Sequence, residues 1–525
     1  MYLWNVYFIT KLYLYNCRAM DFHVWLNISF AILLCVPIPE RYVHLKHFNL
    51  ARQLIAVPAG IALFYYDTWL PSITRVLSQS ADIVNFTSPY LLEIMGRFFN
   101  PPIVAGLLTL YAILFFARKK FKITPFVFLA MLTPLLSLGQ SKVPESNATD
   151  AANSISGSPS NSNLSAQLNS FYHNEAERTV SFSPSTQLDA PFDVIYLHIC
   201  SLSWDDIDFT KQRENPLFKH FDIIFSNFNS AASYSGPTAI RLLRSNCGQP
   251  SHDALYAPPD QQQCLTMDSL QKIGFERQLA MNHDGRYGNF LDDVRERGGL
   301  KATPFEASGL PPYLQSFDGS PIHDDFALLS KWWEKRLQSP TERVALYYNS
   351  ISLHDGNNYH DNGSNRRQGT LESYPKRLNQ LLEDMDRFFS VLQASGRRAV
   401  IVFVAEHGAS VRGDRIQIAG LREIPTPKIT TVPLGIKLIG LPDNPAAKPL
   451  VLSEPSSYLA VSQLLANFVT ISPFGNNSLK LADYMHDLPA TQFVSENDGV
   501  ALMRRDNQYF VRFKGQEWTE YDTSK

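Results

Sequence analysis

This sequence has few cysteines and a net charge of only -2. Five cysteines in 525 residues are too few for a small fold built on disulfides. Lys and Arg number 47 against 49 Asp and Glu, so the chain lacks the basic excess of a protein that coats nucleic acid. Cys17 and Cys35 lie in apolar stretches. Only Cys200, Cys247 and Cys264 therefore need a chemical explanation.

Long apolar runs dominate the first 140 residues. Five of them come near the roughly 17–25 residues that a membrane-spanning helix needs, and they cover residues 1–15, 22–39, 54–70, 101–117 and 123–138. We therefore predict a membrane domain over 1–140 with about five transmembrane helices. Residues 81–99 mix apolar and charged side chains, which is typical either of a helix on the membrane surface or of a loop packed on the spans.

Basic residues in the short loops predict the orientation of these helices, because such loops stay in the cytoplasm. The loops after the second and fourth runs carry Arg41, Lys46 and Arg52, and Arg118, Lys119, Lys120 and Lys122. Everything after residue 138 is then outside the cytoplasm. In a bacterium, this predicts a multi-pass inner-membrane protein with its C-terminal part in the periplasm.

The remainder of the chain has two parts. Residues 141–190 are rich in Ser and Asn and poor in large apolar residues, which predicts a flexible linker. In 191–525, short apolar runs alternate with helical patterns, at 194–200, 221–225, 343–350, 398–405 and 434–439 for strands and 325–337 and 374–394 for helices. We predict an α-helical membrane bundle followed by an α/β domain with a central, mostly parallel sheet.

Polar residues follow three of these predicted strands. Cys200 ends the first, Glu406 and His407 follow the run at 398–405, and His354 follows the run at 343–350. Thiolate, carboxylate and imidazole are ligands that zinc prefers, and sites in such sheets form where parallel strands end. The alternatives are core packing for the cysteine, a buried ion pair for Glu406 and His407, and an ordinary hydrogen-bonded histidine.

Residues 233–243 have the pattern of a helix start, with Ser235 directly before Gly236 and Pro237. Free N–H groups at a helix start favour an ionised hydroxyl that attacks phosphorus. The alternative is that Ser233 or Ser235 only caps the helix.

The order of these residues resembles the alkaline phosphatase and sulfatase superfamily. Four segments resemble the cellulose phosphoethanolamine transferases of bacterial cellulose operons, a branch of the membrane phosphoethanolamine transferases: HICSLSWDDID, SAASYSGPTAIRLLRSNCGQ, NSISLHDGNN and AEHGASVRGDRIQIAGLREIPTP. The resemblance covers essentially the whole chain. It implies an alkaline-phosphatase-like fold for the C-terminal domain.

The resemblance also implies a role for each site residue. Ser235 would be the nucleophile, and Cys200, Ser235, Glu406 and His407 would hold one zinc ion. His354 would act beside the transferred group as acid, base or charge stabiliser. Tyr234 and Arg422 would help bind the phosphoryl oxygens, and Cys247 and Cys264 would form a disulfide.

Two departures from the superfamily bear on the metal. Many relatives have an acidic ligand where this chain has Cys200, which makes the site more selective for zinc. Relatives with a second metal carry a His before a Val-Pro pair, whereas Thr431 precedes that pair here, so one ion is expected. The loop 282–285 is either part of the active site or an ordinary turn.

The implied reaction moves phosphoethanolamine from phosphatidylethanolamine to hydroxyl groups of cellulose, with subunits of the cellulose synthase complex as membrane partners. Alternatives are transfer to lipopolysaccharide, hydrolysis of a phosphodiester, and a silent scaffold role. A sulfatase is disfavoured because Arg241 stands two positions too late for the sulfatase signature. Five aromatic residues are candidates for docking a sugar chain, with core burial as the alternative: Trp204, Trp332, Trp333, Tyr347 and Tyr348.

Overall fold

The computed structural model describes residues 2–17, 20–36, 46–68, 86–97, 101–117, 123–138, 161–183, 190–257, 262–360, 369–414, 417–441, 448–475 and 480–523. The chain forms two compact units. The first comprises residues 1–80, 94–157 and 415–418, and the second comprises 81–93, 158–414 and 419–525. The basic loop at 118–122 and most of the predicted linker lie outside the described residues.

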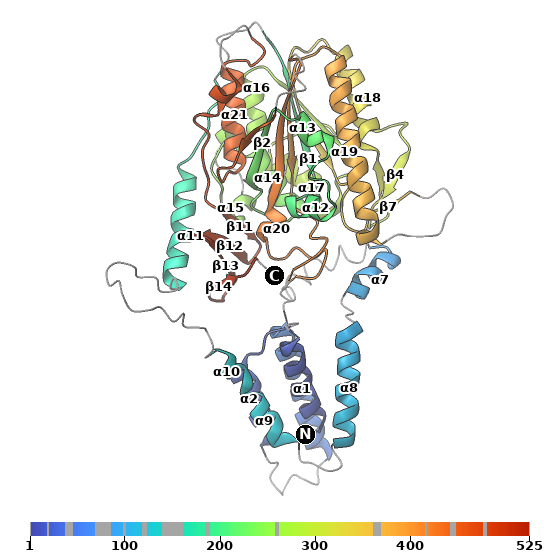
Figure 1. Cartoon of the computed structure of the whole chain (residues 1–525), viewed down its shortest axis with the longest axis vertical. Helices are drawn as coiled ribbons and strands as arrows, with labels where there is room; N and C mark the ends of the chain where they lie inside the picture. Colours follow the sequence, from blue (N-terminus) through green and yellow to red (C-terminus); the bar gives the residue numbers. More distant parts are fainter. Residues whose placement is uncertain are drawn as a thin grey trace. The chain divides into compact units, whose positions relative to one another are not determined.

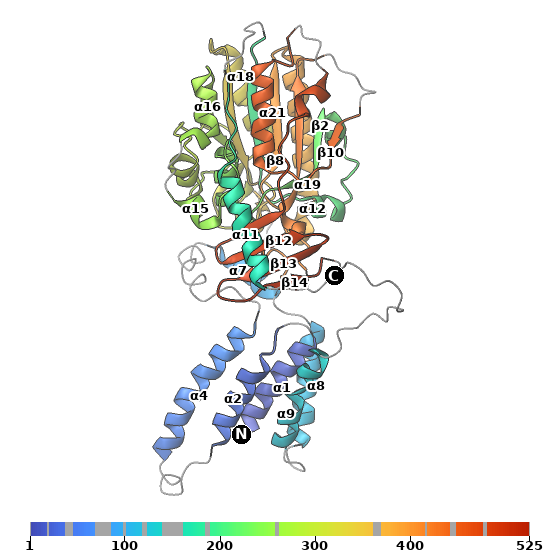
Figure 2. The same ribbon diagram turned by 90° about the vertical axis from the view of Figure 1, so that its left-hand side faces the viewer.

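Helices form at all five of the N-terminal apolar runs (Figure 2). They are α1 (Tyr2–Asn16), α2 (Val24–Cys35), α4 (Lys46–Tyr66), α8 (Pro101–Ala117), α9 (Thr124–Ala130) and α10 (Thr133–Leu138). The fifth run is split in two, with Pro134 at the start of α10, because proline has no N–H and its ring collides with the preceding turn. Among the described residues, no single helix is both long and apolar enough to cross a membrane. By length and composition, α7 (Ser88–Arg97) and Pro101–Phe116 qualify only as a bent pair.

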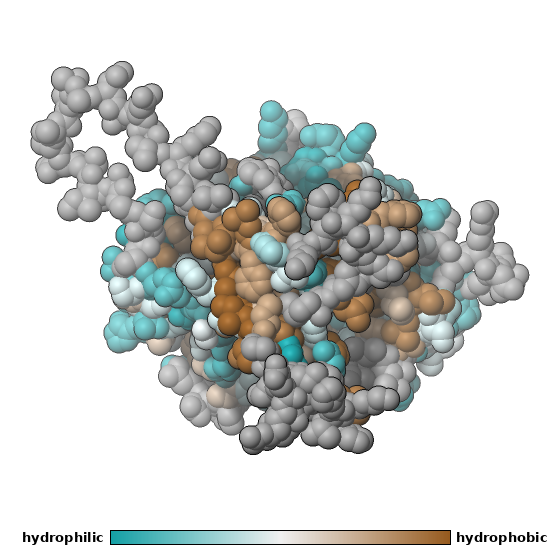
Figure 3. All heavy atoms as spheres, turned by 90° about the horizontal axis from the view of Figure 1, so that it is seen from below, coloured by the Kyte–Doolittle hydropathy of each residue, from teal (hydrophilic) through white to brown (hydrophobic). Residues whose placement is uncertain are grey.

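Apolar side chains are exposed on these helices. Leu33, Ile55 and Phe116 are each exposed by about two thirds or more, and Figure 3, seen from below the view of Figure 1, shows hydrophobic side chains gathered together. The five-span membrane bundle stays a prediction.

A charged cluster is buried inside this first unit. Lys11 Nζ lies 2.5 Å from Asp67 Oδ2, and both side chains are fully buried. Asn27 donates to Asp67 Oδ2 at 2.8 Å, and His23 Nδ1 lies 2.7 Å from Asp67 Oδ1. The ion pair therefore joins α1 to the residue that follows α4, and its hydrogen bonds offset part of the cost of burying two charges.

A seven-stranded sheet forms the centre of the second unit (Figure 1). Its strand order is β10-β2-β9-β8-β1-β6-β3. The strands are β1 (Asp193–Ile199), β2 (Ile223–Asn229), β3 (Glu276–Met281), β6 (Val344–Ser350), β8 (Ala399–Ala405), β9 (Thr431–Ile439) and β10 (Leu450–Leu452). All neighbouring pairs are parallel except the two that involve β9. The sheet is therefore mixed, with the parallel majority that the sequence predicts.

The reversed direction of β9 follows from where the chain goes after β8. Glu406 follows the carboxyl end of β8, and the short helix α20 (Pro427–Thr430) leads directly into β9. Gly408 N donates to Ile429 O at 2.7 Å, so both segments lie at the same edge of the sheet. Because β9 starts at that same edge, it runs antiparallel to both β8 and β2. The end of β8 and the start of β9 therefore lie together at the edge of the sheet where parallel strands end.

Helices cover the sheet on both sides. In Figure 1, α16 (Thr266–Lys272) and α21 (Tyr458–Thr470) lie on one side, with α18 (Asp325–Gln338) and α19 (Thr370–Ala394) on the other. The start of α18 is fixed by Asp324, whose side chain accepts from Ala327 N at 2.8 Å. The central strands β1, β6 and β8 are buried along their whole lengths.

The flexible linker predicted over 141–190 is wrong at residues 161–176, which form helix α11 (Asn161–Ala176). Leu164, Leu168 and Phe171 recur at helical spacing and bury one face of α11. They pack against an antiparallel sheet of β11 (Val494–Asn497), β12 (Val500–Arg505), β13 (Gln508–Phe513) and β14 (Thr519–Tyr521). Burial of these three side chains favours order despite the polar composition.

The segment at 81–99 is described over residues 86–97, of which Ser88–Arg97 form helix α7. Its part at 86–93 belongs to the second unit. Thr87 N donates to Phe317 O at 3.0 Å there, and Tyr90 is buried. Residues 86–93 pack beside a small sheet of β4 (Pro312–Gln315), β5 (Pro321–His323) and β7 (Asn358–Tyr359). Leu92 and Met95 of α7 are exposed, so the helix on the membrane surface stays a prediction.

Candidate metal centre

Two adjacent parallel strands bring the first candidate ligands together. In the register of β1 with β8, Ile199 is paired with Ala405, so Cys200 and Glu406 are the next residues on neighbouring strands. The chain then turns sharply at Ser201, which has a φ of 61°. Leu202 N donates to His407 O at 2.6 Å, which ties the two strand ends to each other. The local fold therefore brings a thiol, a carboxyl and an imidazole to one place.

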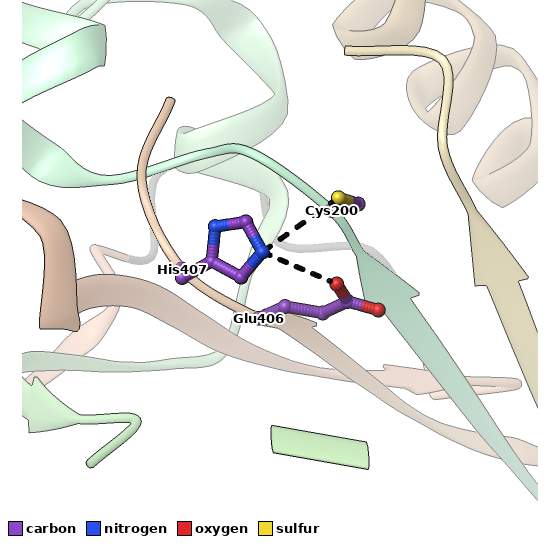
Figure 4. A group of neighbouring side chains, drawn as sticks. All are labelled: Cys200, Glu406 and His407. Carbon is purple, nitrogen blue, oxygen red and sulfur yellow. Dashed lines mark hydrogen bonds and ion pairs between the residues drawn. The ribbon is translucent and has the colours of Figure 1, made fainter. Parts of the chain in front are cut away.

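Three buried side chains converge at this point. His407 Nε2 lies 3.8 Å from Cys200 Sγ and 3.7 Å from Glu406 Oε2. Figure 4 shows this ring nitrogen facing both partners. All three potential ligand atoms lie within 4.8 Å of one another, and no second cluster of this kind occurs among the residues that the structure describes.

Ser235 completes the group from the other side. It is the first residue of α14 (Ser235–Leu243), with Tyr234 at the N-cap position. Ser235 Oγ lies 3.4 Å from Cys200 Sγ and 3.4 Å from His407 Nε2. The serine is half-buried. A hydroxyl at a helix start, in contact with two metal-type ligands, is well placed for nucleophilic attack.

The hydrogen bonds around these side chains fit a metal ion. His407 Nδ1 lies 2.9 Å from Gly408 O, and in the tautomer with the proton on Nδ1 the Nε2 atom presents a lone pair to the cluster. Asn349 donates to Glu406 Oε1 at 2.6 Å. Glu406 Oε2 is buried and has no hydrogen-bond partner among the described residues. Sulfur, nitrogen and carboxylate donors of this kind suit zinc.

The electrostatics of the protein alone favour the neutral forms of these three groups. Burial and the nearby Glu406 raise the pKa of the Cys200 thiol to about 12. Burial raises the pKa of Glu406 to about 7, and burial, with Arg422 nearby, lowers the pKa of His407. A divalent cation would reverse the first two shifts, because it stabilises thiolate and carboxylate. The neutral imidazole is already in the form that binds metal.

The other residues expected in the site lie around this cluster. His354 is half-buried, and its Nδ1 lies 2.8 Å from Asp355 O. Burial, with Arg422 next in effect, lowers the pKa of His354 to about 4. Arg422 donates to Ser201 Oγ at 3.1 Å and lies 3.2 Å from His407 Nδ1. The structure thus brings Arg422 to the metal cluster.

Tyr234 lies next to Ser235, and its hydroxyl is bonded to a carboxylate. Its hydroxyl donates to Glu423 Oε1 at 2.6 Å. The arginine carbon Cζ of Arg422 lies 5.8 Å from the Tyr234 ring centroid. Tyr234 is therefore beside the expected phosphoryl site, with its hydroxyl bonded to a carboxylate.

Sequence reasoning missed Asn349 as a site residue. It is fully buried near the end of β6, and its Oδ1 lies 2.8 Å from His283 Nε2. Gly285 N donates to His283 Nδ1 at 3.1 Å, which leaves the Nε2–H to donate to Asn349. The chain of hydrogen bonds fixes the Asn349 amide so that its NH₂ group faces Glu406. A buried Asn at the end of an apolar strand was the available signal.

The structure confirms the predicted disulfide and places most of the candidate sugar-docking aromatic residues in the core. Cys247 and Cys264 are joined by a disulfide. The aromatic residues considered for sugar docking are core residues instead, apart from the half-buried Trp204. Trp332, Trp333, Tyr347 and Tyr348 are at most 2% exposed, because β6 and α18 turn them into the interior.

Comparisons with known proteins agree over the whole chain. Residues 147–518 match the family model of the cellulose biosynthesis protein BcsG C-terminal domain, and residues 4–136 match that of its N-terminal domain. The chain is 37% identical to cellulose biosynthesis protein BcsG of Escherichia coli (strain K12), over 99% of this chain and 96% of that protein. It is 38% identical to BcsG of Salmonella typhimurium (strain LT2), with the same coverage.

The solved structures that resemble this chain have much lower sequence identity to it. An alkaline phosphatase superfamily protein from Vibrio parahaemolyticus is 13% identical, with a TM-score of 0.48 over 69% of this chain and 89% of that chain. The integral membrane lipooligosaccharide phosphoethanolamine transferase A from Neisseria meningitidis is 13% identical, with a TM-score of 0.41 over 87% of this chain and 94% of that chain. The sequence matches are decisive: this chain belongs to the cellulose biosynthesis protein BcsG family.

Proposed function

We propose that this protein transfers phosphoethanolamine from phosphatidylethanolamine to hydroxyl groups of cellulose. One observation carries the proposal: Ser235 Oγ lies at a helix start, 3.4 Å from both Cys200 Sγ and His407 Nε2. Membership of a cellulose biosynthesis family supports glucan as the acceptor. The resemblance to phosphoethanolamine transferases supports the transferred group.

The metal site is part of the proposal. Cys200, Ser235, Glu406 and His407 would hold one zinc ion, whose positive charge would make the serine hydroxyl more acidic and stabilise negative charge at phosphorus. The buried, unpartnered Oε2 of Glu406 and the lone pair on His407 Nε2 support this donor set.

In the first step, Ser235 Oγ attacks the phosphorus atom of phosphatidylethanolamine. The bond between phosphorus and the glycerol oxygen breaks, and diacylglycerol leaves with a proton on that oxygen. Phosphoethanolamine is then esterified to Ser235. Arg422, close to His407, is a cation suited to the phosphoryl oxygens, and we assign it that role together with Tyr234.

In the second step, a glucosyl hydroxyl, for which we propose the primary one at carbon 6, attacks the same phosphorus. The bond to Ser235 Oγ breaks, and the serine regains a proton. His354 is assigned to proton transfer. Its low pKa keeps the imidazole neutral at pH 7. We assign the neutral ring to accept a proton in one step and to return it in the other.

The proposed donor explains the N-terminal region. A lipid substrate requires the enzyme to work at a membrane, and exposed apolar helices α2, α4 and α8 are suited to lipid contact. We infer an inner-membrane protein whose second unit works in the periplasm. Subunits of the cellulose synthase complex are the proposed membrane partners, because they would deliver the growing glucan.

Solid-state NMR of carbon and phosphorus on extracellular glucan tests the proposal. Cells that make this protein are compared with cells that make Ser235→Ala at equal expression. We expect phosphoethanolamine signals on the glucan only with the serine. Unmodified glucan in both strains would refute the acceptor, and lipopolysaccharide would then be analysed for the group. Modified glucan in both strains would refute the role of Ser235.

A further inference from the structure

A segment from the N-terminal region of the chain packs within the second unit. We call residues 86–93 the docked segment. It lies in sequence between the apolar helices α4 and α8, yet it belongs to the same compact unit as the central sheet. Thr87 N donates to Phe317 O at 3.0 Å, and Tyr90 is only 6% exposed.

Aromatic rings connect the docked segment to His354. The ring centroids of Phe86 and Tyr90 lie 5.2 Å and 5.8 Å from that of Phe317. The Phe317 ring lies in turn 4.8 Å from the His354 imidazole, with 32° between the planes. Spacings of this kind are favourable for aromatic pairs. The imidazole of His354 therefore rests on a ring that the docked segment also contacts.

Tyr90 contacts the loop that carries His354 directly. Its hydroxyl donates to Asp355 Oδ2 at 3.2 Å. Gly356 has a φ of 79°, and a Cβ there would lie 2.5 Å from a Tyr90 ring carbon and 2.7 Å from Phe317 Cβ. Glycine is required at this position, since the backbone both turns left-handed and approaches two rings closely.

The same loop is held from within the unit by Arg377. This buried guanidinium donates to Ser352 O at 2.7 Å and to His354 O at 3.1 Å. His354 Nδ1 donates to Asp355 O, which leaves Nε2 as the nitrogen available for proton transfer. Arg377 thus fixes the backbone of the loop, and the aromatic contacts fix the orientation of the His354 ring.

We propose that the docked segment is a positioning element of the catalytic site. Through Tyr90 and Phe86 it holds Phe317 and residues 351–357, and through them the His354 imidazole. The catalytic site of the second unit is then complete only when the docked segment, residues 86–93, is in place. The inference rests on the proposed function, because His354 matters for catalysis only if the serine reaction occurs.

Full-length protein in lipid nanodiscs, carrying Tyr90→Phe or Tyr90→Ala, tests this inference. Tyr90→Phe keeps the ring and removes the hydrogen bond to Asp355, whereas Tyr90→Ala removes both. Tyr172→Phe and Tyr172→Ala are matched controls, since the Tyr172 hydroxyl donates to Glu496 at 2.8 Å in the contact of α11 with the C-terminal sheet. Amide hydrogen exchange of 351–357, zinc content and diacylglycerol release are measured for each variant.

We expect Tyr90→Ala to speed amide exchange at His354 and Asn357 and to lower kcat about 10- to 100-fold with zinc content unchanged. Tyr90→Phe should have a smaller effect of the same kind, and the Tyr172 variants none. If Tyr90→Ala shows the same amide hydrogen exchange in residues 351–357 as wild type, the inference is overturned. Faster exchange with an unchanged kcat would also overturn it. A wild-type protein that releases no diacylglycerol would refute the proposed function instead, while the exchange data would still decide whether the segment holds the loop.

Discussion

Asn349→Ala is expected to weaken zinc binding without removing any ligand. The Asn349 amide donates to Glu406 Oε1 at 2.6 Å, and both side chains are fully buried. A hydrogen bond to a charged group contributes about 1.5–3 kcal/mol. At about 1.4 kcal/mol per factor of ten, this predicts an affinity loss of roughly 10- to 150-fold. Oε2, which faces His407, would then lose its fixed orientation.

Competition with a colorimetric zinc chelator measures this affinity on the purified full-length protein. Asn246→Ala is the matched control, because Asn246 is equally buried and donates to Ser269 Oγ at 2.9 Å in α16. Both variants should lose thermal stability, and only Asn349→Ala should lose zinc affinity. Wild-type affinity in Asn349→Ala, or equal weakening in both variants, would refute the reasoning.

Three further predictions concern stability. Burial raises the pKa of Glu406 from 4.5 to about 7, so this carboxyl keeps a proton in the folded metal-free protein that it loses in the unfolded chain. The contribution of Glu406 to the free energy of unfolding should therefore fall by about 3 kcal/mol from pH 4.5 to 7. Thermal melting of wild type and Glu406→Gln at both pH values, in the presence of a chelator, measures this, and a difference between the two proteins that does not change with pH would contradict it. Lys11→Met removes the buried cation beside the Asp67 carboxylate, which keeps only its contacts with Asn27 and His23, and should cost about 3–5 kcal/mol in detergent melts. Adding Asp67→Leu should recover part of the loss, and no loss would show that the pair contributes nothing. Replacing Cys247 and Cys264 by serine should cost about 3 kcal/mol in chemical denaturation, since the disulfide closes a loop of 17 residues, and an unchanged midpoint would contradict this.

The central strands follow from the sequence because they are buried on both faces and read as continuous apolar runs. This applies to β1, β6 and β8. The edge strands β3 and β10 were not predicted, because neither has a long, continuous apolar run. Strand β3 begins with Glu, Arg and Gln, and β10 has three residues. Pairing with a neighbour, rather than local pattern, makes these segments strands.

The residues of the candidate site also fall into those that the sequence could predict and those that it could not. Cys200, Glu406 and His407 could be predicted to lie together, because parallel strands end at one edge of a sheet. Asn349 and Tyr90 could not, because their partners are distant in sequence: 57 residues separate Asn349 from Glu406, and 265 separate Tyr90 from Asp355. Contacts of this range depend on the complete fold. Helix α11 was missed although Leu164, Leu168 and Phe171 have helical spacing, because the composition around them is that of a linker.

Peptide mass spectrometry after incubation with phosphatidylethanolamine, and without glucan, tests the central claim most directly. With no acceptor, the serine ester should accumulate. We predict one phosphoethanolamine group on the peptide that contains Ser235, released diacylglycerol in equal amount, and neither in Ser235→Ala. Diacylglycerol release with the group on another residue, or with no group on the protein at any time, would contradict the account.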